Sequence, residues 1–114
     1  MPATGNPLLK GTLDVLVLKT LSWGPMHGVE IITWLEDRSG GHLGVEDSAL
    51  YHALNRMEER GLITSEWGVT ENNRRARYYR VTTKGRAWLR NESEKLVTYA
   101  RTLTTVLTTA SRTA

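Results

Sequence analysis

The hydrophobic pattern of this chain changes its period at Gly61, and this change constrains the fold more than any other feature. Before Gly61, apolar residues recur at steps of three and four, which is typical of helices with one apolar stripe. Residues 62–67 and 78–82 are instead rich in β-branched and aromatic side chains, which is typical of strands. The helical spacing returns at residue 83. This order predicts a mainly α protein with one small β-hairpin, the arrangement of a winged helix-turn-helix domain.

Two helices are predicted before the third and clearest one. The first follows a leucine-rich stripe over residues 9–21, and Gly24-Pro25 ends it because proline cannot continue a helix. The second begins near His27 and stops at residues 39–41, where a serine and two glycines break the pattern. Each helix has one apolar side, so we expect the two to share a core.

The third predicted helix, residues 46–60, has an apolar back and a polar front. The back is formed by Leu50, Ala53, Leu54 and Met57. The front carries groups that can hydrogen-bond to bases or phosphates, namely Ser48, Tyr51, His52, Asn55 and Arg56. Such a helix fits the major groove of B-DNA, where each base pair presents its own donor and acceptor pattern. Two alternatives stay open: Tyr51 packs beside the core, or Arg56 pairs with Glu59.

A basic loop connects the two predicted strands. The net charge of the chain is only +3, but residues 72–91 contain many arginines and no acidic residue. We expect this loop to be a wing that reaches DNA phosphates or a narrow minor groove. Its predicted contacts at the tip of the hairpin are Asn73, Arg74, Arg75 and Arg77. A merely solvated basic surface is the alternative.

The last helix is expected to continue past the domain and to pair with a second copy of the chain. Its apolar residues repeat at steps of four and three, as in a coiled coil, and include Leu89, Leu96, Ala100, Leu103 and Leu107. A helix of about 25 residues is roughly 38 Å long, which is more than the predicted domain can cover. A homodimer would bury the exposed leucines. The alternative is a helix that folds back on its own domain.

The predicted organisation is a mobile leader at 1–7, a winged-helix domain at 8–82, a dimerisation helix at 83–110 and a short tail at 111–114. The chain has no cysteine, so disulfides and thiolate metal sites are excluded. It has no glycine-rich phosphate loop, nucleophile elbow or histidine spacing suited to a metal. We therefore expect no catalysis, metal or cofactor. The longest apolar stretch is too short to span a membrane, and a cytoplasmic location fits best.

Four segments of the chain resemble the PadR family of bacterial transcriptional regulators. They are residues 13–19, 24–28, 49–54 and 79–85, in the order and at the spacing of the family. The resemblance covers roughly residues 8–90, and the single long C-terminal helix is similar to the compact branch of that family. Each motif is weakly specific alone, and four in sequence are strongly specific.

The resemblance implies a repressor that binds palindromic operators as a homodimer. In such a dimer the first helix, through Leu13 and Leu16, joins the C-terminal helix in the interface. Tyr51 matches the tyrosine of the family's reading helix, and Arg74, Arg75 and Arg77 match its basic wing. Many members have proline where this chain has His52, so its operator preference should differ.

Some members of the family are released from DNA by aromatic or drug-like ligands. Trp88, near the start of the last helix, is the residue that could contact such an effector. The favoured alternative is that Trp88 packs against the first helix of its own or the partner chain. The remaining tryptophans are assigned to core or surface packing.

A protein-interaction module without specific DNA binding is the main rival prediction. Such a module would present an apolar front on its third helix. The front of residues 46–60 is polar, which disfavours this alternative.

Overall fold

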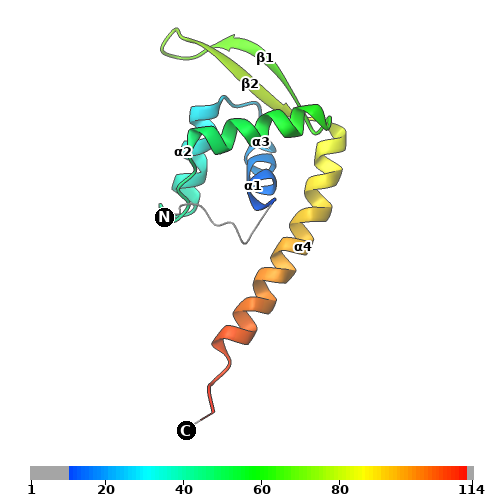
Figure 1. The fold of residues 1–114 in the computed structure, drawn as a ribbon. Helices are drawn as coiled ribbons and strands as arrows, with labels where there is room; N and C mark the ends of the chain where they lie inside the picture. The colour runs from blue at the N-terminus through cyan, green and yellow to red at the C-terminus, as the bar shows by residue number, and fades with distance from the viewer. Residues whose placement is uncertain (1–10, 113–114) are drawn as a thin grey trace.

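A computed structural model describes residues 11–112 of the chain. Its elements are α1 (Thr12–Leu21), α2 (Gly28–Arg38), α3 (Asp47–Glu59), β1 (Ile63–Val69), β2 (Arg75–Val81) and α4 (Thr83–Thr108). The expected order of three helices, one hairpin and a long helix is therefore confirmed (Figure 1). The predicted leader at 1–7 lies outside the described residues.

The core lies where the first three helices meet the base of the hairpin. Its fully buried side chains include Leu18, Leu21, Ile31, Leu50, Leu54, Met57, Leu62 and Ile63. These are the apolar stripes of the helices together with the first residues of β1. Burying a side chain of this size stabilises a fold by about 1.5–3 kcal/mol. The polar front of α3 is consequently left facing solvent.

The hairpin is longer than the sequence predicted, and its loop is shorter. β1 and β2 pair in antiparallel register from Ile63 with Val81 to Val69 with Arg75. The tight turn at Thr70–Arg74 is closed by a hydrogen bond from the Thr70 N–H to the Arg74 carbonyl. Asn73 has a φ of 61°, a left-handed conformation that asparagine tolerates. Arg75 and Arg77 are therefore strand residues rather than tip residues, which corrects the expectation above.

A short backbone bridge ties the α1–α2 connection to the free edge of β2. The Tyr79 N–H donates to the Met26 carbonyl over 2.9 Å, and the Met26 N–H donates back to the Tyr79 carbonyl over 3.2 Å. No strand was expected there, because Pro25 and Met26 carry no extended pattern. The bridge fixes the start of α2 beside the hairpin.

α4 begins at a capped and tightly packed junction. The Thr82 side chain accepts a hydrogen bond from the Gly85 N–H at 3.0 Å and donates to the Gly61 carbonyl at 2.7 Å. Gly85 is buried, and a Cβ at this position would overlap the carbonyl oxygen of Leu62. Only glycine lets α4 start this close to the end of α3.

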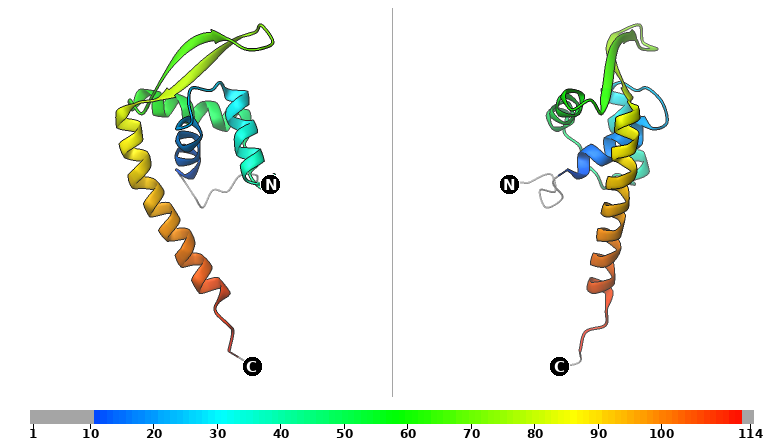
Figure 2. Two further views of the ribbon diagram at one scale, coloured as in Figure 1. Left: turned by 180° about the vertical axis from the view of Figure 1, so that it is seen from behind. Right: turned by 90° about the vertical axis from the view of Figure 1, so that its right-hand side faces the viewer.

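The two halves of α4 have different surroundings. The first half packs along α1, where Trp88 and Leu89 contact the core and Leu96 is half-buried. From Val97 onward every described residue is exposed, and the helix leaves the body on the side away from the hairpin (Figures 1 and 2). The prediction of an overhanging helix is therefore confirmed for its second half only. Within residues 11–112, no helix is long and apolar enough to cross a membrane.

Candidate nucleic-acid interface

The outward face of α3 carries three of the predicted contact residues. Ser48, His52 and Asn55 follow one another at steps of four and three, and all three are exposed. The buried residues of α3 lie on the opposite side of the helix, so this polar face does not pack against the core. It offers a hydroxyl, an imidazole and an amide in a single row.

Tyr51 lies at the edge of that face, turned toward the start of α2. Its hydroxyl occupies the position that a Cβ on Gly28 would take. Glycine at residue 28 therefore makes the room in which this ring sits. The ring packs against Gly28, as in the alternative of packing beside the core, and Tyr51 also stays 44% exposed.

The hairpin presents two arginines on its inner face, the one that continues the core. Cross-strand partners share a face, so Trp67 and Arg77 lie beside Val69 and Arg75 there. The guanidinium carbon of Arg75 is 4.3 Å from the centroid of the Trp67 ring, and that of Arg77 is 5.3 Å away. Both distances are typical of cation–π contacts. Arg74 remains in the turn next to Asn73.

Hydrogen bonds connect Arg77, but not Arg75, to α3 within the described residues. The Arg77 Nε donates to the Ser65 Oγ at 2.8 Å, and the Ser65 hydroxyl donates to the Glu58 Oε2 at 2.7 Å. Arg77 is thus held from both strands and, through Ser65, from α3. Sequence reasoning missed this series of hydrogen bonds because its three residues lie on different elements and are separated along the sequence.

A groove of about 750 Å³ runs between the hairpin and the starts of α2 and α3. One wall is formed by Trp67, Arg74, Arg75 and Arg77, and the other by His27, Gly28 and Tyr51. Among the described residues that line it, none is acidic. We call this feature the wing groove. It is open to solvent, basic and flanked by aromatic rings.

Tyr79 lies at the floor of the wing groove and is buried. Burial raises the pKa of its hydroxyl above the ordinary value of tyrosine; the neighbouring Tyr51 and Glu58 raise it further, while Arg77 opposes the shift. The hydroxyl of Tyr79 is therefore neutral at physiological pH. A neutral phenol can donate a hydrogen bond to an anion in the groove.

Arg56 lies on the other side of α3, facing α1. Its Nη2 donates to the Asp14 Oδ1 at 2.8 Å. Asp14 is only 5% exposed, whereas 55% of the Arg56 side chain is exposed. The alternative partner considered from the sequence was Glu59, but the observed partner is a carboxylate 42 residues away. A helical spacing rule could not reveal that partner.

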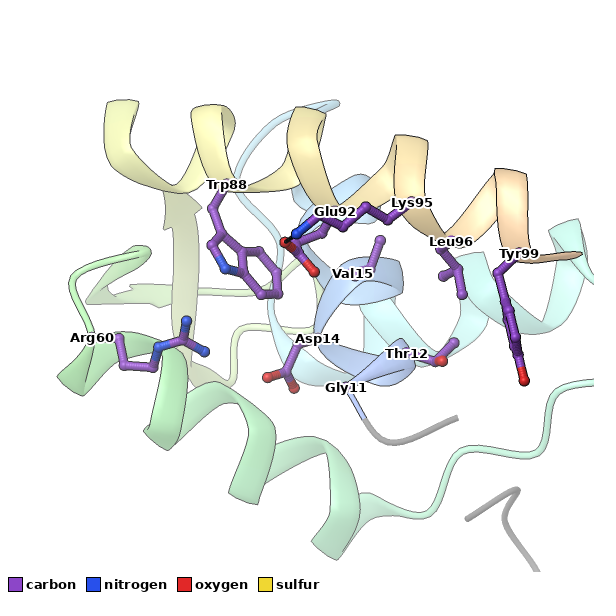
Figure 3. A pocket seen from close by; sticks show the side chains of 10 residues that line it. All are labelled: Gly11, Thr12, Asp14, Val15, Arg60, Trp88, Glu92, Lys95, Leu96 and Tyr99. Carbon is purple, nitrogen blue, oxygen red and sulfur yellow. Dashed lines mark hydrogen bonds and ion pairs between the residues drawn. The ribbon is translucent and has the colours of Figure 1, made fainter. Parts of the chain in front are cut away.

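A second cavity, of about 360 Å³, lies between α1, the end of α3 and the first half of α4 (Figure 3). Trp88 lines it together with Leu96 and Tyr99 of α4, and with Asp14 and Val15 of α1. The Arg60 guanidinium carbon is 5.2 Å from the centroid of the Trp88 ring. Trp88 thus packs beside α1 and also faces an open space.

The residues predicted for the dimer interface fall into two groups. Leu13, Leu16 and Leu89 are half-buried against the core of their own domain. Ala100, Leu103 and Leu107 lie on the exposed second half of α4, where Leu107 is 79% exposed. Leu96 stands between the groups, at the edge of the second cavity.

The sequence pattern of the transcriptional regulator PadR-like family matches residues 17–91. This match covers the core helices, the hairpin and the start of α4. The chain belongs to the PadR-like family. Members of this family are transcriptional regulators and not enzymes, in agreement with the expectation of no catalysis.

Solved structures of PadR-like and other regulators have the same fold. A PadR family regulator from Eggerthella lenta is 30% identical, with a TM-score of 0.72 over 91% of this chain and 88% of that one. A transcriptional regulator from Clostridium thermocellum is 24% identical, with a TM-score of 0.77 over 90% and 97%. A PadR-like regulator from Bacillus cereus is also 24% identical, with a TM-score of 0.77 over 92% and 100%. The last two matches bear on the fold alone.

Sequence reasoning did not assign several residues of this PadR-like regulator to a site, among them Trp67, Ser65, Glu58 and Asp14. Trp67 was assigned to packing, yet it is 54% exposed and contacts two arginines. The alternation of its strand could have placed Trp67 opposite the basic residues. The register that pairs it with Arg77 needed the structure.

Proposed function

We propose that this PadR-like regulator binds double-stranded DNA as a homodimer and represses transcription at a palindromic operator. The observation that carries the proposal is the basic wing groove beside the exposed polar face of α3. A helix face of this kind can enter the major groove, while cations at its side neutralise phosphates. The DNA duplex supplies one phosphate charge per roughly 1.7 Å of its axis, which suits clustered arginines.

The proposed contacts divide into base readers and phosphate binders. Ser48, His52 and Asn55 are assigned to base edges, because they project furthest from the core on α3. The phosphate binders are Tyr51, Asn73, Arg74, Arg75 and Arg77. Arg56 is assigned to a phosphate beside α3, in an orientation fixed by Asp14.

The proposed dimer is supported by the exposed second half of α4. Leu103 and Leu107 stand on one stripe with Ala100, and none of them is covered within the described chain. A second α4 packed on this stripe would remove them from water, at about 25 cal/mol per Å² of apolar surface buried. Leu13, Leu16, Leu89 and Leu96 would extend that interface toward α1. The proposed boundaries are a DNA-binding unit at 8–82 and a dimerisation helix at 83–110.

An aromatic effector is proposed for the cavity beside Trp88. Two aromatic side chains, Trp88 and Tyr99, and two carboxylates, Asp14 and Glu92, line it. A flat apolar ligand could stack there. A DNA partner also implies that the protein resides in the cytoplasm.

The experiment that tests DNA binding compares the wild-type protein with the triple variant Arg74→Ala, Arg75→Ala, Arg77→Ala. We expect weaker binding and a flatter plot of log affinity against log salt, by about 0.9 for each phosphate contact removed. Fluorescence anisotropy with a labelled duplex measures both quantities. The matched control is Arg38→Ala, an exposed arginine at the end of α2. An unchanged slope in the triple variant would contradict the proposed role of the wing.

A further inference from the structure

The wing holds its arginines in place before any partner is bound. Both guanidinium groups lie against the single indole of Trp67, at 4.3 Å for Arg75 and 5.3 Å for Arg77. The indole is 54% exposed, so the core does not explain why a large aromatic ring stands at this position. Trp67 packs against the two cations instead.

The contact between Arg77 and Ser65 fixes which end of the guanidinium is free. Its Nε is used by the Ser65 hydroxyl, which is itself held by the Glu58 carboxylate of α3. The two terminal nitrogens are left for a partner. Within residues 11–112, neither Arg75 nor Arg77 is in an ion pair. Two oriented cations, neither of them in a direct ion pair, therefore line the wing groove.

We propose that Trp67 is a positioning residue that presents Arg75 and Arg77 as a preformed pair to one sugar-phosphate strand lying in the wing groove. This inference rests on the proposed DNA binding. It adds where the sugar-phosphate strand lies and which residue holds the two arginine side chains in place. A phosphodiester fits the donors, because guanidinium groups bind phosphate oxygens through paired hydrogen bonds. Tyr79 also lines the wing groove, and none of the described residues that line it carries a carboxylate to repel the strand.

Order in the free protein matters because a flexible arginine loses side-chain entropy when it binds. Stacking on Trp67 restricts the two arginine side chains in the free protein, so less side-chain entropy is lost when DNA binds. Arg74, in the turn, has no such support in the described structure. We therefore expect Arg75 and Arg77 to contribute more affinity than Arg74, although all three carry the same charge.

The test measures the affinity of Trp67→Ala for a labelled duplex of about 24 base pairs, two turns of DNA, over a range of salt concentrations. A loss of about 5- to 10-fold is expected, with a smaller salt slope. Trp67→Phe should retain most of the affinity, because phenylalanine also offers a ring face. Trp23→Ala is the matched control, since Trp23 is 67% exposed and does not line the wing groove. It should bind as the wild type does.

A double-mutant cycle separates positioning from direct contact. In an Arg75→Ala, Arg77→Ala background, Trp67→Ala should cost nothing further, because its role is exercised through the two arginines. An equal loss in both backgrounds, or no loss in the wild-type background, would overturn the proposal. Failure of the wild-type protein to bind the duplex would instead overturn the proposed function itself.

A measurement on the free protein supplies a readout independent of DNA. The side-chain protons of Arg75 should show upfield ring-current shifts in the NMR spectrum, and Trp67→Ala should abolish them. Arg75 resonances at ordinary positions in the wild-type protein would contradict the stack. Thermal unfolding of the same variants distinguishes this effect from a loss of fold.

Discussion

At the scale of single residues, the contact between Asp14 and Arg56 gives a structural role to a residue that is also proposed to bind a phosphate. Asp14 is a nearly buried carboxylate in the first turn of α1, where the helix dipole also favours negative charge. Arg56 binds it from α3 and so holds the reading helix against α1. Asn55, one residue earlier, points away from the core and is exposed. Adjacent residues of α3 thus have different roles.

Arg56→Ala is expected to lower the free energy of unfolding by about 1–3 kcal/mol, because it leaves a buried carboxylate without its partner. Urea denaturation measures this quantity. Asn55→Ala is the matched neighbour, and it should leave stability within about 0.5 kcal/mol of the wild type while weakening DNA binding. Adding Asp14→Asn to the Arg56→Ala variant should recover part of the lost stability. Equal stability of Arg56→Ala and the wild type would contradict the assigned role.

At the scale of elements, the sequence predicted those whose periodicity is strong. The predicted third helix at 46–60 agrees with α3 at Asp47–Glu59, and the last helix, predicted at 83–110, is observed as α4 at Thr83–Thr108. The strands were less well predicted, because Gly68 is a poor strand former and the arginines of β2 give no strand signal of their own. Cross-strand pairing with Trp67 and Val69 makes Arg75 and Arg77 part of the sheet. That pairing joins residues of two different strands, so the local sequence around each arginine does not reveal it.

The candidate site shows the same division. The polar row on α3 follows directly from helical spacing, so Ser48, His52 and Asn55 could be grouped from the sequence. The contacts of Arg77 with Ser65, and of Arg56 with Asp14, join residues 12 and 42 positions apart. Such partners depend on how the elements pack. Sequence patterns therefore predicted the exposed residues of the candidate site, but not the tertiary contacts that hold its arginines in place.

For α4, the structure indicates which leucines test dimerisation without disturbing the domain. Leu103 and Leu107 are 38% and 79% exposed, so their replacement removes no core contact. Leu103→Lys with Leu107→Lys should yield monomers in sedimentation velocity experiments, because four charges would face one another across the seam. Unfolding of the domain itself should be unchanged.

The control for this pair uses the opposite face of α4. Thr98→Lys with Thr105→Lys adds the same charge at exposed positions and should remain dimeric. A dimer that survives the leucine substitutions would place the interface elsewhere. Loss of the dimer in both variants would show that charge alone disrupts assembly.

At the scale of the whole molecule, the elements proposed for DNA binding and for dimerisation lie at opposite ends. The hairpin projects from one end of the described chain and α4 extends from the other, along a longest dimension of 63 Å (Figure 2). The Trp88 cavity lies between them, beside α1 and the end of α3. A ligand there would contact α1 and α4 and could shift α3, which is how an effector could alter DNA binding.

We propose that a symmetric dimer reads DNA through α3 and the wing. The most direct test is selection of duplexes from a random pool by the wild-type protein, followed by sequencing of the bound fraction. A symmetric dimer should enrich an inverted repeat, with half-sites about one or more helical turns of roughly 10 base pairs apart. Enrichment of a single asymmetric site, or of no sequence at all, would contradict it.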